Sequence, residues 1–255
     1  MNILERINDI FRFSEGKGWI ERTPSFIHDY KKSYPKLSIL EDNHSDIREE
    51  CEKLLAYKEK ITNMEGLYGE MTVGGIHDIK WKSFVFKSGR YVEKNCEMCP
   101  KTAALLKQIP RVKQAFFSIL DPNQYIRPHQ GYYYGFLRYH LGVIIPNNNE
   151  NNKCWIRIND DPIDNKNNDD DSIIEGEKYH WRNGEGIMFN DNYIHDAENG
   201  SDEVRVILWI DIARKFPWPL EILNRLILKL AYFIPDVKKA SKRAEVDFDF
   251  KPKYT

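Results

Sequence analysis

The sequence predicts a mainly β protein with flanking helices, whose core is a double-sheet jelly roll or a barrel. Short runs rich in β-branched and aromatic residues recur at near-regular spacing from Gln114 to Ile212. Polar, turn-forming segments separate these runs, as expected of antiparallel strands in such folds. Helical periodicity is confined to the residues before about 112 and after 216, so helices are expected to cover one face of a sheet.

The length allows either one large domain or two small ones. The 255 residues include 41% hydrophobic residues, enough to form a substantial core. Neither an internal repeat nor a Gly/Ser linker is found, which favours a single domain over residues 1–255. Within it we expect a helical and irregular flank at 1–112, a jelly-roll catalytic core at 113–215, and a C-terminal helix and tail at 216–255.

The charge and cysteine content restrict the environment and the partners. Lys and Arg total 38 against 39 Asp and Glu, so no nucleic-acid-binding surface is expected. The four cysteines include one isolated Cys96-Glu-Met-Cys99 motif, which is weak support for zinc. The N-terminus lacks the apolar run of a signal peptide, and no transmembrane helix is evident, so a cytoplasmic location is expected.

Three elements are expected before residue 113, besides a short helix near Ile3–Phe13. Ser45 can cap a helix that continues to about Met64, because apolar residues from Ile47 to Ile61 fall on one face. The alternating stretch Lys80–Phe86 predicts a strand. Pro100 can begin a helix that ends before Pro110.

Six strands and two polar insertions are expected in the core. Residues 147–153 and 160–171 are rich in Asn and Asp and are interpreted as hairpin-loop insertions. The second could also be a calcium loop, but it lacks the Gly and terminal Glu of that motif. The strands are Ala115–Leu120, Ile126–His129, Arg138–Ile145, Lys153–Ile158, Gly186–Phe189 and Glu203–Ile212.

The most apolar segment, Leu220–Ile234, is interrupted by charged residues and predicts an amphipathic helix. The simplest interpretation is a helix packed on the domain. The alternative is a helix that contacts a membrane surface peripherally or forms a dimer. The oligomeric state is not fixed by the sequence.

Two histidines stand at strand ends, where a rigid sheet can fix a metal ligand. His129 ends a predicted strand, and His195 lies in a turn-rich context before the last long strand. A facial triad for non-haem iron adds a carboxylate, usually two residues after the first histidine, but that position is Gly131. Asp191 and Asp196 do not have the spacing expected of that carboxylate. A purely structural role for the two histidines therefore stays open.

Arg205 lies inside an otherwise apolar strand. A guanidinium buried there has to be paired, because an uncompensated buried charge costs several kcal/mol. Its partner is either an internal Asp or Glu, or the carboxylate of a ligand.

These residues belong to one ordered pattern that resembles the aspartyl/asparaginyl β-hydroxylase family of Fe(II)- and 2-oxoglutarate-dependent dioxygenases. The resemblance covers about residues 95–215 and implies a double-stranded β-helix (cupin-like) core. It also accounts for Gly131, because the family has a glycine where the carboxylate would be. The pattern comprises Ser118, Pro128-His129-Gln-Gly131, Leu137-Arg138-Tyr-His140-Leu-Gly142, Ile145-Pro146, Trp181-Arg-Asn-Gly184-Glu, Phe189-Asn-Asp191, His195-Asp-Ala197-Glu-Asn199, Arg205 and Asp211-Ile-Ala-Arg214.

The resemblance implies a role for each matching residue. His129 and His195 would bind Fe(II). Arg205 would hold the distal carboxylate of 2-oxoglutarate, with help from Ser118, and His140 would contact this cosubstrate near the metal. Asp191 would either orient a ligand histidine or form a turn.

Arg138 would point at the substrate. Some family members have Arg-Xaa-Arg just before the later histidine, whereas this chain has Phe136-Leu137-Arg138. The implied reaction couples O₂ and oxidation of 2-oxoglutarate to hydroxylation of an unactivated C–H bond. The substrate would be by default the β-carbon of peptidyl Asp or Asn, and alternatively a lipid acyl chain or a small amino-acid-like metabolite. There are two competing hypotheses. One is a related oxygenase with another outcome, such as halogenation, and the other is a jelly-roll module that only binds a partner.

Overall fold

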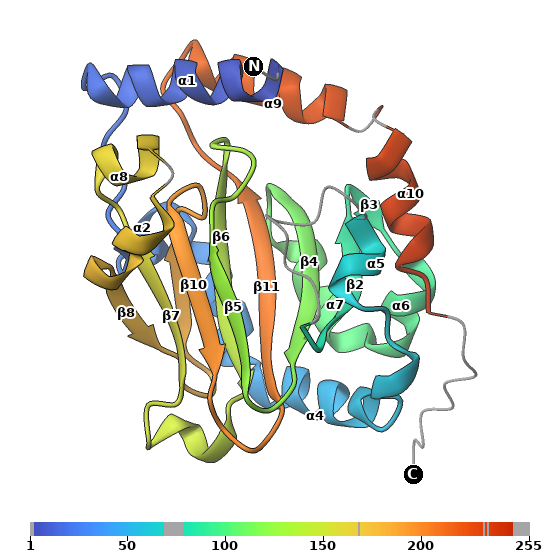
Figure 1. Ribbon diagram of the computed structural model, residues 1–255. Coiled ribbons are helices and arrows are strands. Elements are labelled where there is room, and N and C mark those ends of the chain that lie inside the picture. The colour runs from blue at the N-terminus through green and yellow to red at the C-terminus, as the bar shows by residue number, and fades with distance from the viewer. Residues whose placement is uncertain (1–2, 69–78, 168, 232, 234, 247–255) are drawn as a thin grey trace.

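Two antiparallel sheets form the centre of the molecule (Figure 1). The computed structural model describes residues 3–68, 79–167, 169–231, 233 and 235–246. The larger sheet has the order β1 (Phe26–Ile27), β9 (Gly186–Phe189), β6 (Phe136–Ile144), β11 (Arg205–Ala213), β4 (Val112–Leu120), β2 (Trp81–Ser88) and β3 (Arg90–Tyr91). The smaller has the order β5 (Gln124–His129), β10 (Ile194–Asn199), β7 (Cys154–Asn159) and β8 (Glu177–His180). The predicted double-stranded β-helix with flanking helices is confirmed.

The helices surround these sheets unevenly. Helices α1 and α9 lie across one end of the sheets, and α4 lies toward the opposite end (Figure 1). Within the described ranges, no helix combines the length and the apolar content needed to cross a bilayer. The helices are α1 (Ile3–Gly16), α2 (Tyr30–Ser33), α3 (Ser38–Asp42), α4 (His44–Leu55), α5 (Met64–Tyr68), α6 (Glu93–Met98), α7 (Pro100–Gln108), α8 (Pro162–Asn167), α9 (Leu220–Ala231) and α10 (Pro235–Arg243).

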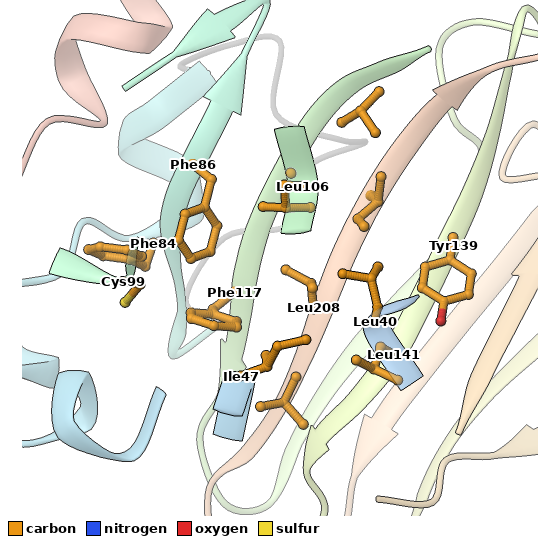
Figure 2. Packing of buried hydrophobic residues seen from close by; sticks show 14 of the residues in the cluster. Leu40, Ile47, Phe84, Phe86, Cys99, Leu106, Phe117, Tyr139, Leu141 and Leu208 are labelled. Atoms are coloured by element: carbon orange, nitrogen blue, oxygen red, sulfur yellow. The ribbon is translucent and has the colours of Figure 1, made fainter. Parts of the chain in front are cut away.

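The largest apolar cluster lies between the larger sheet and the helices that cover its outer face. In Figure 2, Phe117 and Leu208 from two strands of this sheet lie near Ile47 and Leu40 from the covering helices. A second cluster lies between the two sheets. Alternate residues of β4 divide between the two, because successive side chains of a strand point to opposite faces.

The same alternation directs polar residues into the space between the sheets. On β11, Leu208 and Ile210 belong to the outer cluster, whereas Ile207 and Trp209 face the smaller sheet. Arg205 and Asp211 share the parity of this inner set. On β6, Arg138 and His140 likewise alternate with the apolar residues Tyr139, Leu141 and Val143 of the outer cluster.

The expected helix from Ser45 to Met64 is wrong beyond Leu55. Helix α4 ends there, a 3₁₀ turn covers Lys58–Lys60, and Ile61 is extended. Tertiary pairing overrides the helical pattern, because the Ser83 amide donates to the Thr62 carbonyl at 3.0 Å and draws the chain onto β2. The helix also begins earlier than expected, with Asn43 as its N-cap.

The sequence-based strand assignment omits β1, β3, β8 and β10. The last omission matters most, because His195 lies on β10 and not in a turn. The larger sheet also draws β1, β2 and β3 from residues before 113. The helix expected from Pro100 is confirmed as α7, whereas residues 247–255 of the C-terminal tail lie outside the described residues.

Both polar insertions have local structure. The second contains α8 and a 3₁₀ turn over Asp170–Glu175. In the first, Asn147, Asn148, Asn149 and Asn152 all have φ between 47° and 57°. Asn adopts this left-handed region more readily than other residues with side chains, so the Asn run has a backbone reason.

Glu50 of α4 provides the fold prediction. Its buried carboxylate accepts the backbone amides of Lys101 and Thr102, both at 2.8 Å, and so caps the first turn of α7. Glu50→Ala is expected to lower the free energy of unfolding in urea by about 3 kcal/mol, because it leaves these amides unsatisfied. The control Glu49→Ala, which removes only exposed ion pairs, should change it far less. Equal losses in the two variants would contradict the capping role.

Candidate functional site

A small cavity lies between the inner faces of the two sheets. Its volume is about 20 Å³, which accommodates roughly one water molecule. All six residues predicted for the site line it, and the structure therefore brings them together from strands far apart in the sequence. The lining residues are Trp81, Ser118, Ile126, His129, Arg138, His140, Ile156, Trp181, Phe189, His195, Ala197, Arg205, Ile207 and Trp209.

His129 and His195 lie side by side on adjacent strands. They are register partners of β5 and β10, and their ring centroids are 4.1 Å apart. Each Nδ1 lies 2.7 Å from a backbone carbonyl two residues earlier, that of Arg127 or Tyr193. A carbonyl only accepts hydrogen bonds, so each Nδ1 carries the proton and each Nε2 keeps its lone pair. This is the tautomer that ligation of a metal through Nε2 requires.

The histidines of the cavity are held neutral. Burial lowers the pKa of His129 to about 4. Burial also places the pKa values of His195 and His140 well below the ordinary range, with nearby charges adding to the effect. Neutral imidazole is the form that binds a metal, so the environment favours ligation over protonation.

Arg205 on β11 and Arg138 on β6 lie at opposite ends of the cavity. The Arg205 side chain is fully buried, and its Nε and Nη1 have no hydrogen-bond partner. The guanidinium carbon lies 4.7 Å from the centroid of the Trp181 ring, and no ion pair with a carboxylate is found in the part of the chain that the structure describes. Burial lowers its pKa to about 10. An arginine in this state has unused donors for an anion.

Ser118 and His140 add further polar atoms to the cavity wall. The Ser118 hydroxyl accepts a hydrogen bond from Trp81 Nε1 at 2.9 Å, which leaves its own proton available. Both ring nitrogens of His140 lack a partner, and its ring contacts those of Phe189 and Trp209, each at 4.9 Å between centroids. Buried polar atoms without partners are rare in folded proteins and indicate a missing ligand or water.

Arg138 is paired inside the protein. Its Nη2 lies 2.7 Å from Asp191 Oδ2 and its Nε lies 2.8 Å from Asp211 Oδ1. The guanidinium also stacks 3.8 Å from the ring centroid of Trp209. Two carboxylates therefore compensate its charge within the protein.

Asp191 also explains the glycine after the first histidine. A Cβ on Gly131 would lie 2.1 Å from Asp191 Oδ2, so no side chain fits there. Burial raises the pKa of Asp191 to about 6, against the opposing effect of Arg138. No group of three His, Cys, Asp or Glu residues arranged for a metal occurs in the described ranges. The donors that the site offers are the two imidazoles.

The donor set fits a metal ion together with an anionic cosubstrate. Two neutral Nε2 atoms from the protein leave other coordination positions for ligands from solution. The unpaired guanidinium of Arg205 lies in the same cavity and can take a carboxylate of such a ligand. A ligand larger than one or two waters also requires the lining side chains to move, because the cavity is small.

Asn165 of α8 is a positioning residue that the sequence does not reveal. Its backbone carbonyl accepts from Gln130 Nε2 at 2.9 Å, and its side-chain oxygen accepts from the Ile194 amide at 2.7 Å. Gln130 follows His129 and Ile194 precedes His195, so one residue ties the ends of both histidine strands together. It lies in the insertion interpreted as a hairpin loop, and no motif marks it.

Comparison with known proteins gives consistent matches. The family model described as aspartyl/asparaginyl beta-hydroxylase matches residues 41–215. The ornithine lipid ester-linked acyl 2-hydroxylase of Rhizobium tropici is 30% identical over 208 residues, covering 81% of this chain and 67% of that enzyme. The human aspartyl/asparaginyl beta-hydroxylase is 28% identical over 138 residues, covering 52% of this chain but only 16% of the human protein. A prolyl-4-hydroxylase structure from Pseudomonas putida aligns with a TM-score of 0.42 at 13% identity, covering 84% of this chain and 100% of that one.

Replacement of Asn165 provides a test of the site geometry. Asn165→Ala is expected to lower the affinity for Fe(II) about tenfold, because the side chain no longer fixes the start of the His195 strand. The measurement is a metal titration under anaerobic conditions. The matched control is Asn167→Ala, since Asn167 is exposed on the same helix. Equal affinities in the two variants would show that Asn165 does not position the histidines.

Proposed function

This chain belongs to the aspartyl/asparaginyl β-hydroxylase family of 2-oxoglutarate-dependent dioxygenases, and on that premise we propose that it hydroxylates an acyl chain of a lipid. In this proposal His129 and His195 bind Fe(II) through their Nε2 atoms. Arg205 binds a carboxylate of 2-oxoglutarate, assisted by Ser118 and His140. When bound, iron, 2-oxoglutarate and O₂ together supply the oxidising power for an unactivated C–H bond.

The protein's own residues have three tasks in this reaction. The carbonyls of Arg127 and Tyr193 hold the two histidines in the ligand tautomer. The tryptophans and aliphatic residues of the lining exclude water, which strengthens every electrostatic contact in the cavity. Arg205 fixes the direction of the cosubstrate, so that its other end is oriented toward the histidines.

The single observation that carries the proposal is the buried, unpaired guanidinium of Arg205 in the same cavity as the histidine pair. For this residue the sequence left two partners open, an internal carboxylate or a ligand carboxylate. The described part of the chain offers no internal ion pair, which supports the ligand. The guanidinium is then compensated only when the cosubstrate is bound.

Three observations support an acyl chain over an acidic side chain as the substrate. The relative from Rhizobium tropici is named as an acyl 2-hydroxylase, and its match covers most of this chain. The cavity also lacks a free cation at the Arg138 end, because Asp191 and Asp211 already compensate Arg138. At the position of the missing arginine, Phe136 is buried in an apolar cluster.

Hydroxylation of the β-carbon of peptidyl Asp or Asn is the second candidate. The human relative is named aspartyl/asparaginyl beta-hydroxylase and is 28% identical over the matched region. This candidate requires Arg138 to exchange one of its internal carboxylates for that of the substrate.

Arg205→Ala tests the cosubstrate site. Turnover of 2-oxoglutarate is expected to fall about a hundredfold or more, because a buried carboxylate–guanidinium pair is lost. The anaerobic protein with Fe(II) and 2-oxoglutarate should show a visible charge-transfer band that His195→Ala and His129→Ala abolish. Arg127→Ala is the control, since its side chain is exposed two residues before His129. Normal turnover in Arg205→Ala would exclude the assigned role.

Substrate choice is tested by competition between two classes of acceptor. Purified protein with Fe(II), 2-oxoglutarate and O₂ is given either diacylated lipid in mixed micelles or an Asp-containing peptide. Succinate formation above the background without acceptor, and a gain of one oxygen by mass spectrometry, are expected with the lipid only. A hydroxylated peptide and unchanged lipid would reverse the order of the two candidates.

A further inference from the structure

The exposed apolar residues of this protein are concentrated on one side. Twelve large hydrophobic residues in the described ranges are exposed, and eight of them lie on α1, α9 and the residues adjoining these helices. We call these eight residues the apolar face. They are Ile10, Phe13, Trp19, Trp218, Ile222, Leu226, Leu230 and Phe233.

On α9 the exposed residues form a regular stripe. Ile222, Leu226 and Leu230 are spaced by four, so they lie on one side of the helix. Asn224 and Leu228, on the other side, are buried against the body of the protein. The stripe is therefore not needed to attach the helix, because a separate set of residues does so.

Helix α1 has the same two-sided character. Asn8 and Phe11 are buried, whereas Ile10 and Phe13 point away from the domain. The ring of Trp19 packs edge-on against Phe13 at 5.9 Å between centroids. An exposed Trp–Phe pair is typical of residues that enter the interfacial layer of a membrane.

Cations flank the apolar residues on both helices. Lys17 Nζ lies 5.5 Å from the ring centroid of Phe13. Arg6, Lys17 and Lys229 are ion-paired to no residue that the structure describes. This combination of apolar and aromatic residues with unpaired cations is complementary to a lipid bilayer, whose interior is apolar and whose headgroup layer can be anionic.

The apolar face lies over the end of the sheets nearest the histidines. Asn224 of α9 accepts from Tyr133, and Asn8 of α1 donates to the Tyr132 carbonyl at 3.0 Å, so both helices rest on the loop that follows His129. Arg12 of α1 donates to Asn192 at 3.0 Å, in the loop that precedes His195. Figure 1 shows both helices across this end of the sheets.

We propose that the apolar face docks on a lipid bilayer that contains anionic lipid, and that docking brings the histidine end of the cavity to the depth of the acyl chains. The choice of acyl chains as substrate rests on the proposed function. Docking itself requires neither iron nor turnover, so the two can fail separately.

The experiment is co-sedimentation of the full chain with vesicles of phosphatidylcholine, with and without phosphatidylglycerol. Binding is expected, stronger with phosphatidylglycerol and weaker at high salt. The double variant Leu226→Glu/Leu230→Glu should lower the partition coefficient about tenfold or more, because both side chains would leave the apolar layer. The matched control is Ile163→Glu/Ile174→Glu, since those residues are 69% and 72% exposed but lie outside the apolar face.

Tryptophan emission gives a second readout. Of the six tryptophans, Trp19 and Trp218 are exposed, and both belong to the apolar face. Vesicles should shift the emission to shorter wavelength in the parent and in the control variant, but not in Trp19→Phe/Trp218→Phe.

Three results would overturn the proposal. The first is absence of vesicle binding by a folded parent. The second is equal loss of binding in the control variant. The third is a parent dimer that the Leu226→Glu/Leu230→Glu variant dissociates, which would assign the face to a second copy. Vesicle binding without lipid hydroxylation would leave docking in place and reject the proposed substrate, whereas hydroxylation of micellar lipid without vesicle binding would do the reverse.

Discussion

The strict alternation of side chains along a strand is the constraint on which this structure depends. In β6 and β11 it sends hydrocarbon to the helices and arginine, histidine and aspartate to the inside. A slip of one residue in either strand would bury those charges in the main core and expose leucine and isoleucine to the cavity. The dense packing of the outer cluster thus holds the register, and the register holds the site.

The electrostatics of the cavity are asymmetric along its length. At one end, Arg138 is balanced by two carboxylates and sits beside two neutral imidazoles. At the other end, Arg205 has no counter-charge among the described residues. The cavity therefore has one uncompensated positive end and one balanced end in the folded protein, before any ligand is present.

Much of the fold and site follows from local pattern, and the exceptions have physical causes. The ordered motif singles out Ser118, His129, Arg138, His140, His195 and Arg205, and the structure brings all six to one cavity. Strand β10 is not evident in the sequence, because it is rich in Asp, Glu and Asn. These polar residues find their partners only in the folded protein, as Asp196 does in its ion pair with Arg157. The pairing of residues 61–63 with β2 is equally non-local. The partners of Arg138, and the contribution of Asn165, depend on distances that no sequence spacing encodes.

The contact between Gly131 and Asp191 has an evolutionary consequence. A carboxylate two residues after His129 cannot be gained by one substitution, since its Cβ would overlap Asp191. Removing Asp191 first would leave Arg138 with Asp211 alone in a buried setting. A side chain at residue 131 also meets the Asp191 backbone carbonyl, which lies 2.8 Å from the same Cβ position, so replacing the Asp191 side chain alone does not make room for it. The effect of a substitution at either of these two positions therefore depends on the residue at the other, and the two positions are epistatic.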